Sequence, residues 1–419
     1  MKKVLIIEDS SSLGFFQVGM IQQKLHYPTH LIKSKKDLDN ILQSESEDFF
    51  IAILNMILPD AKNGEALDTL LSYNIPVIVH SSVDESEIRS KMATYDIVDY
   101  VSKIEIDNFE YILRLVEFVH KYGKSKILIV DDSSTARMQI SHALKGVGFE
   151  IFEAASGDEA LVVLEKEDDI VLVTMDKEMP GMNGYDTIKN IRRGYDLSSL
   201  SVLGVSSSND KLESINFIKN GANDFIYKPF LAEELLLRVM SNIELISAIH
   251  SANERAIRDF MTKLYNRKYV FEDGLIEYKS SLKEGKNIIL CMIDIDKFKL
   301  INDTYGHPVG DRAIILLADI LTEVQAKGAQ YSARIGGEEF LMMWIGSTMQ
   351  EVHKMMEQLR EKLSNNYILS EAGEEIRFTV SIGMAEVYRN DFEQSLSTVD
   401  KALYQAKESG RDCITVYKE

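Results

Sequence analysis

The length and charge of the chain limit its architecture and its partners. It has 419 residues, which predicts about two to four domains of roughly 100–200 residues each. Its formal net charge of −19 argues against nucleic acid or an anionic membrane surface as the main partner. A local cationic pocket for a phosphorylated small molecule is compatible with that charge. The only cysteines are Cys291 and Cys413, so we expect no disulfide framework and a reducing compartment.

The first ten residues, MKKVLIIEDS, predict a β-strand. Their apolar run, VLII, stops at Glu8 and is shorter than the ~7–15 apolar residues of a signal peptide. No apolar run elsewhere reaches the roughly 18 residues that a membrane helix needs. We therefore expect no membrane segment and a cytoplasmic location.

An internal repeat predicts two successive copies of one fold. Residues 4–12, VLIIEDSSS, match residues 127–135, ILIVDDSST, and each is a short apolar strand that ends in an acidic pair. Short β-branched runs alternate with amphipathic helical stretches, which predicts α/β domains with doubly wound parallel sheets over 1–121 and 124–246. Functional groups then belong at the carboxyl ends of the strands. The other matching segments, at an offset of about 120–125 residues, are 50–60 with 170–181, 76–82 with 201–207, and 98–103 with 223–228.

The second copy carries a set of charged and polar side chains at its predicted strand ends. Three carboxylates can hold a divalent cation, and a hydroxyl and an ammonium group beside them can steady the oxygens of a phosphoryl group. Any one loop acid is more often simply solvated, but all five groups at the matching strand ends predict a site. The five residues are Asp131, Asp132, Asp176, Ser206 and Lys228.

This copy resembles the receiver domain of two-component response regulators. The resemblance is carried by VDDSSTAR, by DKEMPGMNG, by GANDF and by KPF. It implies that Asp176 is the phosphoacceptor, that Asp131, Asp132 and Asp176 bind Mg²⁺, and that Lys228 pairs with the phosphate. It further implies Ser206 and Phe225 as switch residues, a cis bond before Pro229, and an upstream histidine kinase or phosphotransfer protein.

The first copy departs from this pattern at the phosphoacceptor. That position is Asn55, whose neutral amide cannot become an acyl phosphate, and Ile104 stands where the proline would be. We expect a receiver that is not phosphorylated and serves as a structural or docking module. A vestigial metal site or an unusual ligand is the alternative. The positions that are kept are Glu8, Asp9, Ser81 and Lys103.

Residues 232–260 predict one long helix with a seam of residues at alternating spacings of four and three. Such a heptad seam predicts a connector that forms a parallel dimer, with two asparagines that set the register. A single amphipathic helix that packs on its own domain is the alternative. The seam residues are Leu235, Val239, Asn242, Ile246, Ile249, Asn253, Ala256 and Phe260.

The segment RIGGEEFLMMW (334–344) places two glycines and two adjacent glutamates before an apolar strand. If this hairpin pairs beside the strand that ends at Asp294, that carboxylate and Glu339 converge on one face. Two carboxylates and a backbone carbonyl make an oxygen-rich Mg²⁺ site of the kind used with nucleoside triphosphates. The bend then lets one glutamate reach the metal while Glu338 faces the reacting group. Alone the motif is weak, because a solvated acidic turn reads the same way.

Residues from about 255 to 419 resemble the GGDEF family of diguanylate cyclases. The motifs occur in family order: DFMTKLYNRK, DIDKFKLINDTYGHPVGD, RIGGEEF, TVSIGMA and DKALYQAKESGRD. The resemblance implies an α/β domain of nucleotidyl-cyclase type over 247–419, with the connector helix at its start. It also implies that two GTP molecules are condensed into cyclic di-GMP by a homodimer, since each domain holds one GTP.

Carried over residue by residue, the resemblance implies the site. Mg²⁺ (or Mn²⁺) is held by Asp294, the Ile295 carbonyl and Glu339. Glu338 acts on the 3′-hydroxyl as general base or orienting group. The GTP contacts are Asn302 and Asp311 for the guanine edge, the backbone at Phe298 and Lys299 for the phosphates, and Lys407 with Arg411, spaced i, i+4 on a helix, as a phosphate clamp.

Two departures from the family concern the entry motif and product inhibition. Met261 and Lys263 replace the usual Leu and Gly, which we expect to be tolerated. The family's Arg-x-x-Asp inhibition site reads KGAQ here, so Lys327 keeps a charge but Gln330 does not supply the carboxylate. We expect weak or absent feedback inhibition by that route.

The main hypothesis is a diguanylate cyclase controlled by phosphorylation at Asp176 through a population shift. The alternative is a non-catalytic response regulator that binds GTP or a protein partner. A narrower variant accepts ATP as well as GTP, against which Asp311 at the base-reading position argues.

Overall fold

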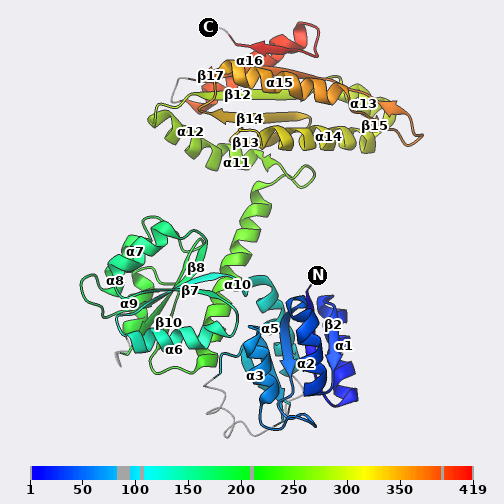
Figure 1. The fold of residues 1–419 in the computed structure, drawn as a ribbon. Coiled ribbons are helices and arrows are strands. Elements are labelled where there is room, and N and C mark those ends of the chain that lie inside the picture. Colours follow the sequence, from blue (N-terminus) through cyan, green and yellow to red (C-terminus); the bar gives the residue numbers. More distant parts are fainter. Residues whose placement is uncertain (1, 83–94, 104–107, 208–211, 388–390, 418–419) are drawn as a thin grey trace. The chain divides into compact units, whose positions relative to one another are not determined.

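The computed structural model describes residues 2–82, 95–103, 108–207, 212–387 and 391–417 (Figure 1). Contacts divide the chain into two compact units, Met1–His250 and Ser251–Glu419. Within the described residues no helix has the length and apolar character needed to cross a membrane. The departure expected at Ile104 lies outside the described residues.

The first sheet has five parallel strands in the order β2-β1-β3-β4-β5. Its central strands are buried on both faces, since helices cover each side, and they therefore read as continuous apolar runs. The elements are β1 (Lys3–Ile7), α1 (Ser11–Leu25), β2 (Thr29–Ile32), α2 (Lys35–Glu45), η1 (Ser46–Asp48), β3 (Phe49–Leu54), α3 (Glu65–Ser72), β4 (Val77–Ser81), β5 (Asp99–Ser102) and α5 (Asn108–Tyr122).

The second sheet repeats this strand order, as β7-β6-β8-β9-β10, again with every pair parallel. The parallel α/β fold expected for both copies is therefore present. The elements are β6 (Lys126–Val130), α6 (Ser134–Lys145), β7 (Glu150–Ala154), α7 (Gly157–Lys166), β8 (Ile170–Asp176), α8 (Gly184–Ile191), β9 (Ser201–Ser206), α9 (Glu213–Lys219), β10 (Asp224–Tyr227) and α10 (Ala232–Ile257).

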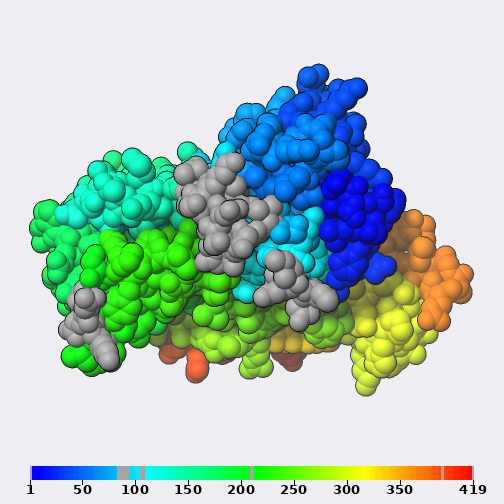
Figure 2. Space-filling view, turned by 90° about the horizontal axis from the view of Figure 1, so that it is seen from below, coloured from blue at the N-terminus to red at the C-terminus, as the bar shows by residue number. Residues whose placement is uncertain are grey.

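Within the first unit the two sheet domains share one continuous apolar core. Phe118 of α5 packs edge-on against Phe149, with 6.1 Å between the ring centroids. Arg114 of the same helix pairs with Glu244 of α10 at 2.6 Å. The surfaces of both domains are seen in Figure 2, in blue and in cyan to green. The two copies are therefore packed together rather than tethered by a linker.

The first half of α10 belongs to the second sheet domain, which corrects part of the predicted dimer seam. Its seam residues up to Ile246 are buried against their own sheet, as the alternative of an amphipathic helix had it. Asn242 accepts a hydrogen bond from Ser201 Oγ at 2.9 Å and donates one to the Arg238 carbonyl at 2.9 Å. It therefore serves its own domain and not a dimer register. The helix also ends at Ile257, before the predicted Phe260.

The second unit is built on a six-stranded mixed sheet in the order β11-β13-β14-β12-β17-β18. A small two-stranded sheet joins β15 to β16. The elements are β11 (Tyr265–Asn266), α11 (Arg267–Phe271), α12 (Asp273–Lys283), β12 (Ile288–Ile295), α13 (Phe298–Tyr305), α14 (His307–Gln325), β13 (Tyr331–Gly336), β14 (Glu339–Ile345), α15 (Met349–Ser364), β15 (Ile368–Leu369), β16 (Glu375–Ile376), β17 (Val380–Val387), α16 (Phe392–Glu408) and β18 (Ile414–Val416).

Strand β12 lies between β14 and β17, inside the sheet of this unit. An apolar cluster covers each of its two faces. Its side chains alternate between two apolar clusters, as the two-residue period of a strand requires. Ile289, Cys291 and Ile293 enter the cluster with α14 and α15. Ile288 and Leu290 enter the cluster with α12 and α16. The strand is thereby held rigidly, and the polar residue at its carboxyl end has a fixed position.

Replacing Gly383 by alanine should destabilise this second unit. The added Cβ would lie 2.2 Å from the Leu403 nitrogen and 2.5 Å from the Val399 carbonyl oxygen, so β17 and α16 would have to separate. We expect a loss of about 1–3 kcal/mol in the free energy of unfolding. Denaturation followed by the fluorescence of Trp344, the single tryptophan, measures it.

The control for that substitution is Gly336→Ala, because a Cβ there meets no atom within 4 Å. An equal loss of stability in both variants would contradict the packing argument.

Candidate functional site

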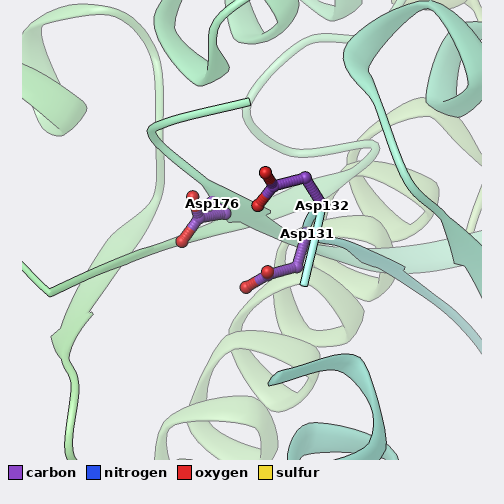
Figure 3. Close-up of side chains that lie close together, drawn as sticks. All are labelled: Asp131, Asp132 and Asp176. Carbon is purple, nitrogen blue, oxygen red and sulfur yellow. The ribbon is translucent and has the colours of Figure 1, made fainter. Parts of the chain in front are cut away.

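Three aspartates meet at the carboxyl edge of the second sheet, as expected from the sequence. Asp131 and Asp132 follow β6, and Asp176 ends β8 (Figure 3). One carboxylate oxygen from each lies within 4.8 Å of the others, with Asp131 and Asp176 buried and Asp132 exposed. Hard carboxylate oxygens at this spacing suit a divalent cation such as Mg²⁺.

Lys228, just after β10, pairs with two of these carboxylates. Its Nζ lies 2.5 Å from Asp131 Oδ2 and 2.7 Å from Asp176 Oδ1. Burial acts to lower the pKa of Lys228, but hydrogen bonds to the two aspartates raise it overall. Burial also raises the pKa of Asp176, against the opposing effect of the lysine. The cluster is thus short of positive charge in the absence of a cation.

The remaining expected residues of this site lie on the neighbouring strands. Ser206 ends β9 and is buried. Phe225 of β10 packs on Phe217 and on Tyr227, with ring centroids 5.0 Å and 4.6 Å away. The peptide bond between Lys228 and Pro229 is cis, which confirms the expectation from the KPF motif.

One contact of this site was not predicted from the sequence. Lys177, the neighbour of Asp176, pairs with the buried carboxylate of Glu213 at 3.1 Å. Tyr185 donates its hydroxyl to the same carboxylate at 2.6 Å. These contacts connect α8 and α9 to the residue next to the aspartate cluster. The only sequence signal for this was a lysine directly after the aspartate.

The matching edge of the first sheet has its own internal pairs, although the buried Ser81 Oγ has no partner among the described residues. Lys103 pairs with the buried Glu8 at 2.7 Å. Asn55 donates to Asp9 Oδ1 at 2.8 Å and to the Ile57 carbonyl at 3.1 Å. An amide that donates to the neighbouring acid takes the place of the third carboxylate, so this edge has less negative charge to attract a cation.

In the second unit, Asp294 and Glu339 lie directly opposite each other in the antiparallel pair of β12 and β14. The predicted hairpin of β13 and β14 is present, and Gly337 stands in its turn with φ of +49°, in the left-handed region that favours glycine. Glu338 occupies the turn itself. Glu338 therefore lies in the bend, and Glu339 begins the strand that follows it.

Asp294 is held by a lysine in the same manner as the first cluster. Lys407 Nζ lies 2.8 Å from Asp294 Oδ2. Burial raises the pKa of Asp294 to about 6, against the lysine and with help from Glu338 and Glu339. A carboxylate with these neighbours would gain from a bound divalent cation, which fits the Mg²⁺ or Mn²⁺ expected here.

Arg334, two residues before the glycines, fixes the hairpin turn and was not predicted to do so. Its Nε donates to the Gly337 carbonyl at 2.9 Å, and its guanidinium pairs with Asp259 at 3.1 Å. Burial acts to raise the pKa of Asp259, but hydrogen bonds from Thr262 and the arginine lower it overall. The turn is therefore fixed to the segment that directly follows α10.

Helices α13 and α14 carry the residues that the sequence predicts to contact the nucleotide. No side chain caps the N-terminus of α13. The backbone N–H groups at Phe298 and Lys299 therefore receive no capping bond from a side chain there, and N–H groups of this kind can bind phosphate oxygens. Asn302 Oδ1 lies against Gly310, and a Cβ added to that glycine would lie 2.0 Å from this oxygen. That buried oxygen has no partner among the described residues. Asp311, at the start of α14, is exposed.

The prediction that Lys407 and Arg411 share one helix face is wrong. Helix α16 ends at Glu408, and Arg411 has φ of +68° in the loop beyond it. It lines a pocket together with Asp296 and Lys297, at the end of β12 and the start of α13. The two cations therefore reach the edge of the sheet from different backbone conformations.

A lysine-bound carboxylate cluster lies at the edge of a doubly wound sheet, and a lysine-bound carboxylate pair lies at a glycine turn. The fold and these two sites define a multidomain α/β protein with two separate candidate metal sites.

The sequence model of the response regulator receiver domain matches residues 127–240. The model of the diguanylate cyclase GGDEF domain matches residues 256–413. Diguanylate cyclase A of Treponema denticola is 31% identical over 304 residues, which are 66% of this chain and 81% of the relative. Response regulator PleD of Caulobacter vibrioides is 27% identical over 69% of this chain and 65% of its own length.

A solved two-component system response regulator/GGDEF domain protein is similar in structure and in sequence. It has a TM-score of 0.54 and 30% identity, and the match covers 59% of this chain and all of that one. The chain belongs to the family of diguanylate cyclases in which a response regulator receiver domain is joined to a GGDEF domain.

The pKa of Asp294 leads to a stability test in the absence of metal ions. Its folded value of about 6 lies above the unfolded value of about 3.9, so the folded state binds the extra proton between these values. Stability should therefore rise as the pH falls through 6 and be lost as the pH rises. Relative to Asp294→Asn, we expect a change of roughly 1–3 kcal/mol between pH 7 and pH 4.5.

Denaturation curves of both proteins across that pH range measure this difference. Parallel pH profiles for wild type and Asp294→Asn would contradict the assigned environment of the carboxyl group.

Proposed function

We propose that the chain is a phosphorylation-regulated diguanylate cyclase that condenses two GTP into cyclic di-GMP and two pyrophosphates as a homodimer. The observation that carries this proposal is the register of β12 against β14. It sets Asp294 opposite Glu339, beside Lys407 and at the glycine turn. Two carboxylates, a lysine and the glycine turn at one edge of the sheet support the proposal of an oxygen-rich metal site there.

The chemistry follows from groups at that edge. Asp294, Glu339 and the Ile295 carbonyl would hold the divalent cation, which when bound screens the negative charge of the triphosphate. Glu338 would orient the 3′-hydroxyl of GTP and accept its proton. The 3′-oxygen bonds to the α-phosphorus of the second GTP as the bond to pyrophosphate breaks. The same step in the opposite sense closes the ring.

Substrate recognition is assigned to the surrounding helices. The side-chain amide of Asn302 and the exposed carboxylate of Asp311 would read the guanine edge. The uncapped N-terminus of α13 at Phe298 and Lys299 would bind phosphate oxygens through backbone N–H groups. Lys407 and Arg411 would add positive charge from the other side.

Control is assigned to the second sheet domain. An upstream histidine kinase or phosphotransfer protein in the cytoplasm would phosphorylate Asp176, with Asp131, Asp132 and Asp176 holding Mg²⁺. Lys228 would move from the carboxylates to the new phosphoryl group. Ser206 at the end of β9 and Phe225 within β10 would follow it and shift the population of domain arrangements.

Residues 1–121 are, in this proposal, a degenerate receiver that works as a structural or docking module. The support is a strand order identical to that of the second sheet, a shared apolar core, and a retained pair of Glu8 and Lys103. Asn55 removes the phosphoacceptor, and its bond to Asp9 fills the place of the ligand. The three domains of the proposal are thus 1–121, 124–246 and 247–419.

Dimer formation is assigned to the second half of α10 and the residues after it. The residues from Ser251 to Ala256 are all exposed, unlike most of those in the first half of the helix. Leu245 is 57% exposed and Phe260 is 78% exposed, on either side of the half-buried Ile249. Apolar side chains at this spacing would pair with a second copy and bring two GTP sites together.

The test is turnover of GTP with Mg²⁺, with the product identified by mass, with and without acetyl phosphate as phosphodonor. We expect cyclic di-GMP whose rate of formation rises at least several-fold with the donor and does not rise in Asp176→Asn. Glu339→Gln should reduce the rate by roughly 100-fold or more, because a metal ligand is lost.

A rate of cyclic di-GMP formation that does not change with acetyl phosphate would support the cyclase activity and contradict its control by phosphorylation. No product from folded protein that still binds GTP would favour the non-catalytic alternative.

The first domain makes a separate prediction about phosphorylation. Mass spectrometry of the intact protein after acetyl phosphate treatment should show a single added phosphoryl group, which is lost in Asp176→Asn. Asn55→Asp is the matched variant, because it restores a carboxylate next to Asp9 and Lys103. A phosphoryl group that remains in Asp176→Asn would contradict the assignment.

A further inference from the structure

The loop that carries Arg411 is held in an unusual backbone conformation. Arg411 and Asp412 have φ of +68° and +45°, so two consecutive non-glycine residues lie in the left-handed region. L-residues rarely adopt this conformation, and it persists only where surrounding contacts impose it. The Arg411 N–H also donates to the Ala406 carbonyl at 3.2 Å, which closes the turn after α16.

The first contact that imposes this conformation comes from Asp296, at the end of β12. Its Oδ2 accepts the backbone N–H of Asp412 at 3.0 Å and the hydroxyl of Thr379 at 2.7 Å. Its Oδ1 accepts the hydroxyl of Ser381 at 2.6 Å. The carboxylate is buried and both of its oxygens are used. Asp296 therefore anchors the loop. It lies only two residues after the proposed metal ligand Asp294, but its own oxygens are occupied by these hydrogen bonds.

The second contact comes from Arg360, which reaches the loop from α15. Its guanidinium donates to Asp412 Oδ1 through Nε at 3.2 Å and through a terminal nitrogen at 2.8 Å. The same terminal nitrogen contacts the Asp412 carbonyl oxygen. Glu357, one helical turn earlier, orients the guanidinium at 2.8 Å. Arg360 thus holds both the side chain and the backbone of the residue after Arg411.

We propose that Asp296, Arg360 and Asp412 form a positioning network that presents Arg411 to the triphosphate of GTP. This inference rests on the proposed function, since it assumes that Arg411 binds phosphate. The helix alone cannot position it, because α16 ends three residues earlier, at Glu408. Without the network the turn would relax out of the left-handed region, and Arg411 would leave the pocket that it lines with Lys297.

A double-mutant cycle on nucleotide affinity tests this inference. The ligand is 3′-deoxy-GTP, which lacks the attacking hydroxyl and so binds without reacting, measured on the full chain with Mg²⁺. We expect Arg411→Ala and Arg360→Ala each to weaken binding roughly tenfold. The double variant should be no weaker than Arg411→Ala alone, because Arg360 acts only through Arg411.

Two further variants separate positioning from general stability. Lys362 lies on α15, like Arg360, and pairs with Glu323 of α14. Lys362→Ala removes this ion pair without changing the loop, and should leave the affinity unchanged. Asp412→Asn keeps an oxygen for Arg360 in a residue that tolerates left-handed backbone, and should retain the wild-type affinity. Asp412→Ala should lose affinity as Arg360→Ala does.

Three results would overturn the inference. Additive losses in the double variant, or an affinity that is unchanged by Arg360→Ala, would reject the network and leave the proposed function intact. An affinity unchanged by Arg411→Ala would instead remove Arg411 from the proposed GTP site, and the network with it.

Discussion

A carboxylate buried at the end of a strand requires a compensating positive charge, and every proposed site in this chain depends on that requirement. An uncompensated charge in such a place costs several kcal/mol. In each domain a lysine far away in the sequence supplies the compensation. The pairs are Glu8 with Lys103 at 2.7 Å, Asp176 with Lys228 at 2.7 Å, and Asp294 with Lys407 at 2.8 Å.

These pairs also explain why the sites are poised for ligands. Burial raises the pKa of both Asp176 and Asp294. The neighbouring carboxylates, Asp131 at the first site and Glu338 and Glu339 at the second, raise it further, against a single lysine at each site. A divalent cation would complete the balance and free the lysine for a phosphate. In the first domain Asn55 donates to Asp9 instead, and no such deficit arises. In the proposed function, the same architecture thus serves one domain that is phosphorylated and one that is not.

Sequence reasoning located the groups that follow strands and missed the contacts that cross the fold. Asp131, Asp176 and Asp294 could be placed because strand ends are readable from short apolar runs. Asn242 was misread, because a heptad pattern is the same whether the helix packs on a partner or on its own sheet. The network around Arg411 could not be foreseen, since Arg360 and Asp412 are 52 positions apart in the sequence.

In the proposed function, phosphorylation at Asp176 brings two GTP sites together. The decisive measurement is the specific rate of cyclic di-GMP formation across protein concentrations, with and without beryllium fluoride as a phosphoryl mimic. We expect a specific rate that rises with protein concentration, and a midpoint that moves to lower concentration with the mimic. A specific rate that stays unchanged by the mimic at every concentration would contradict it.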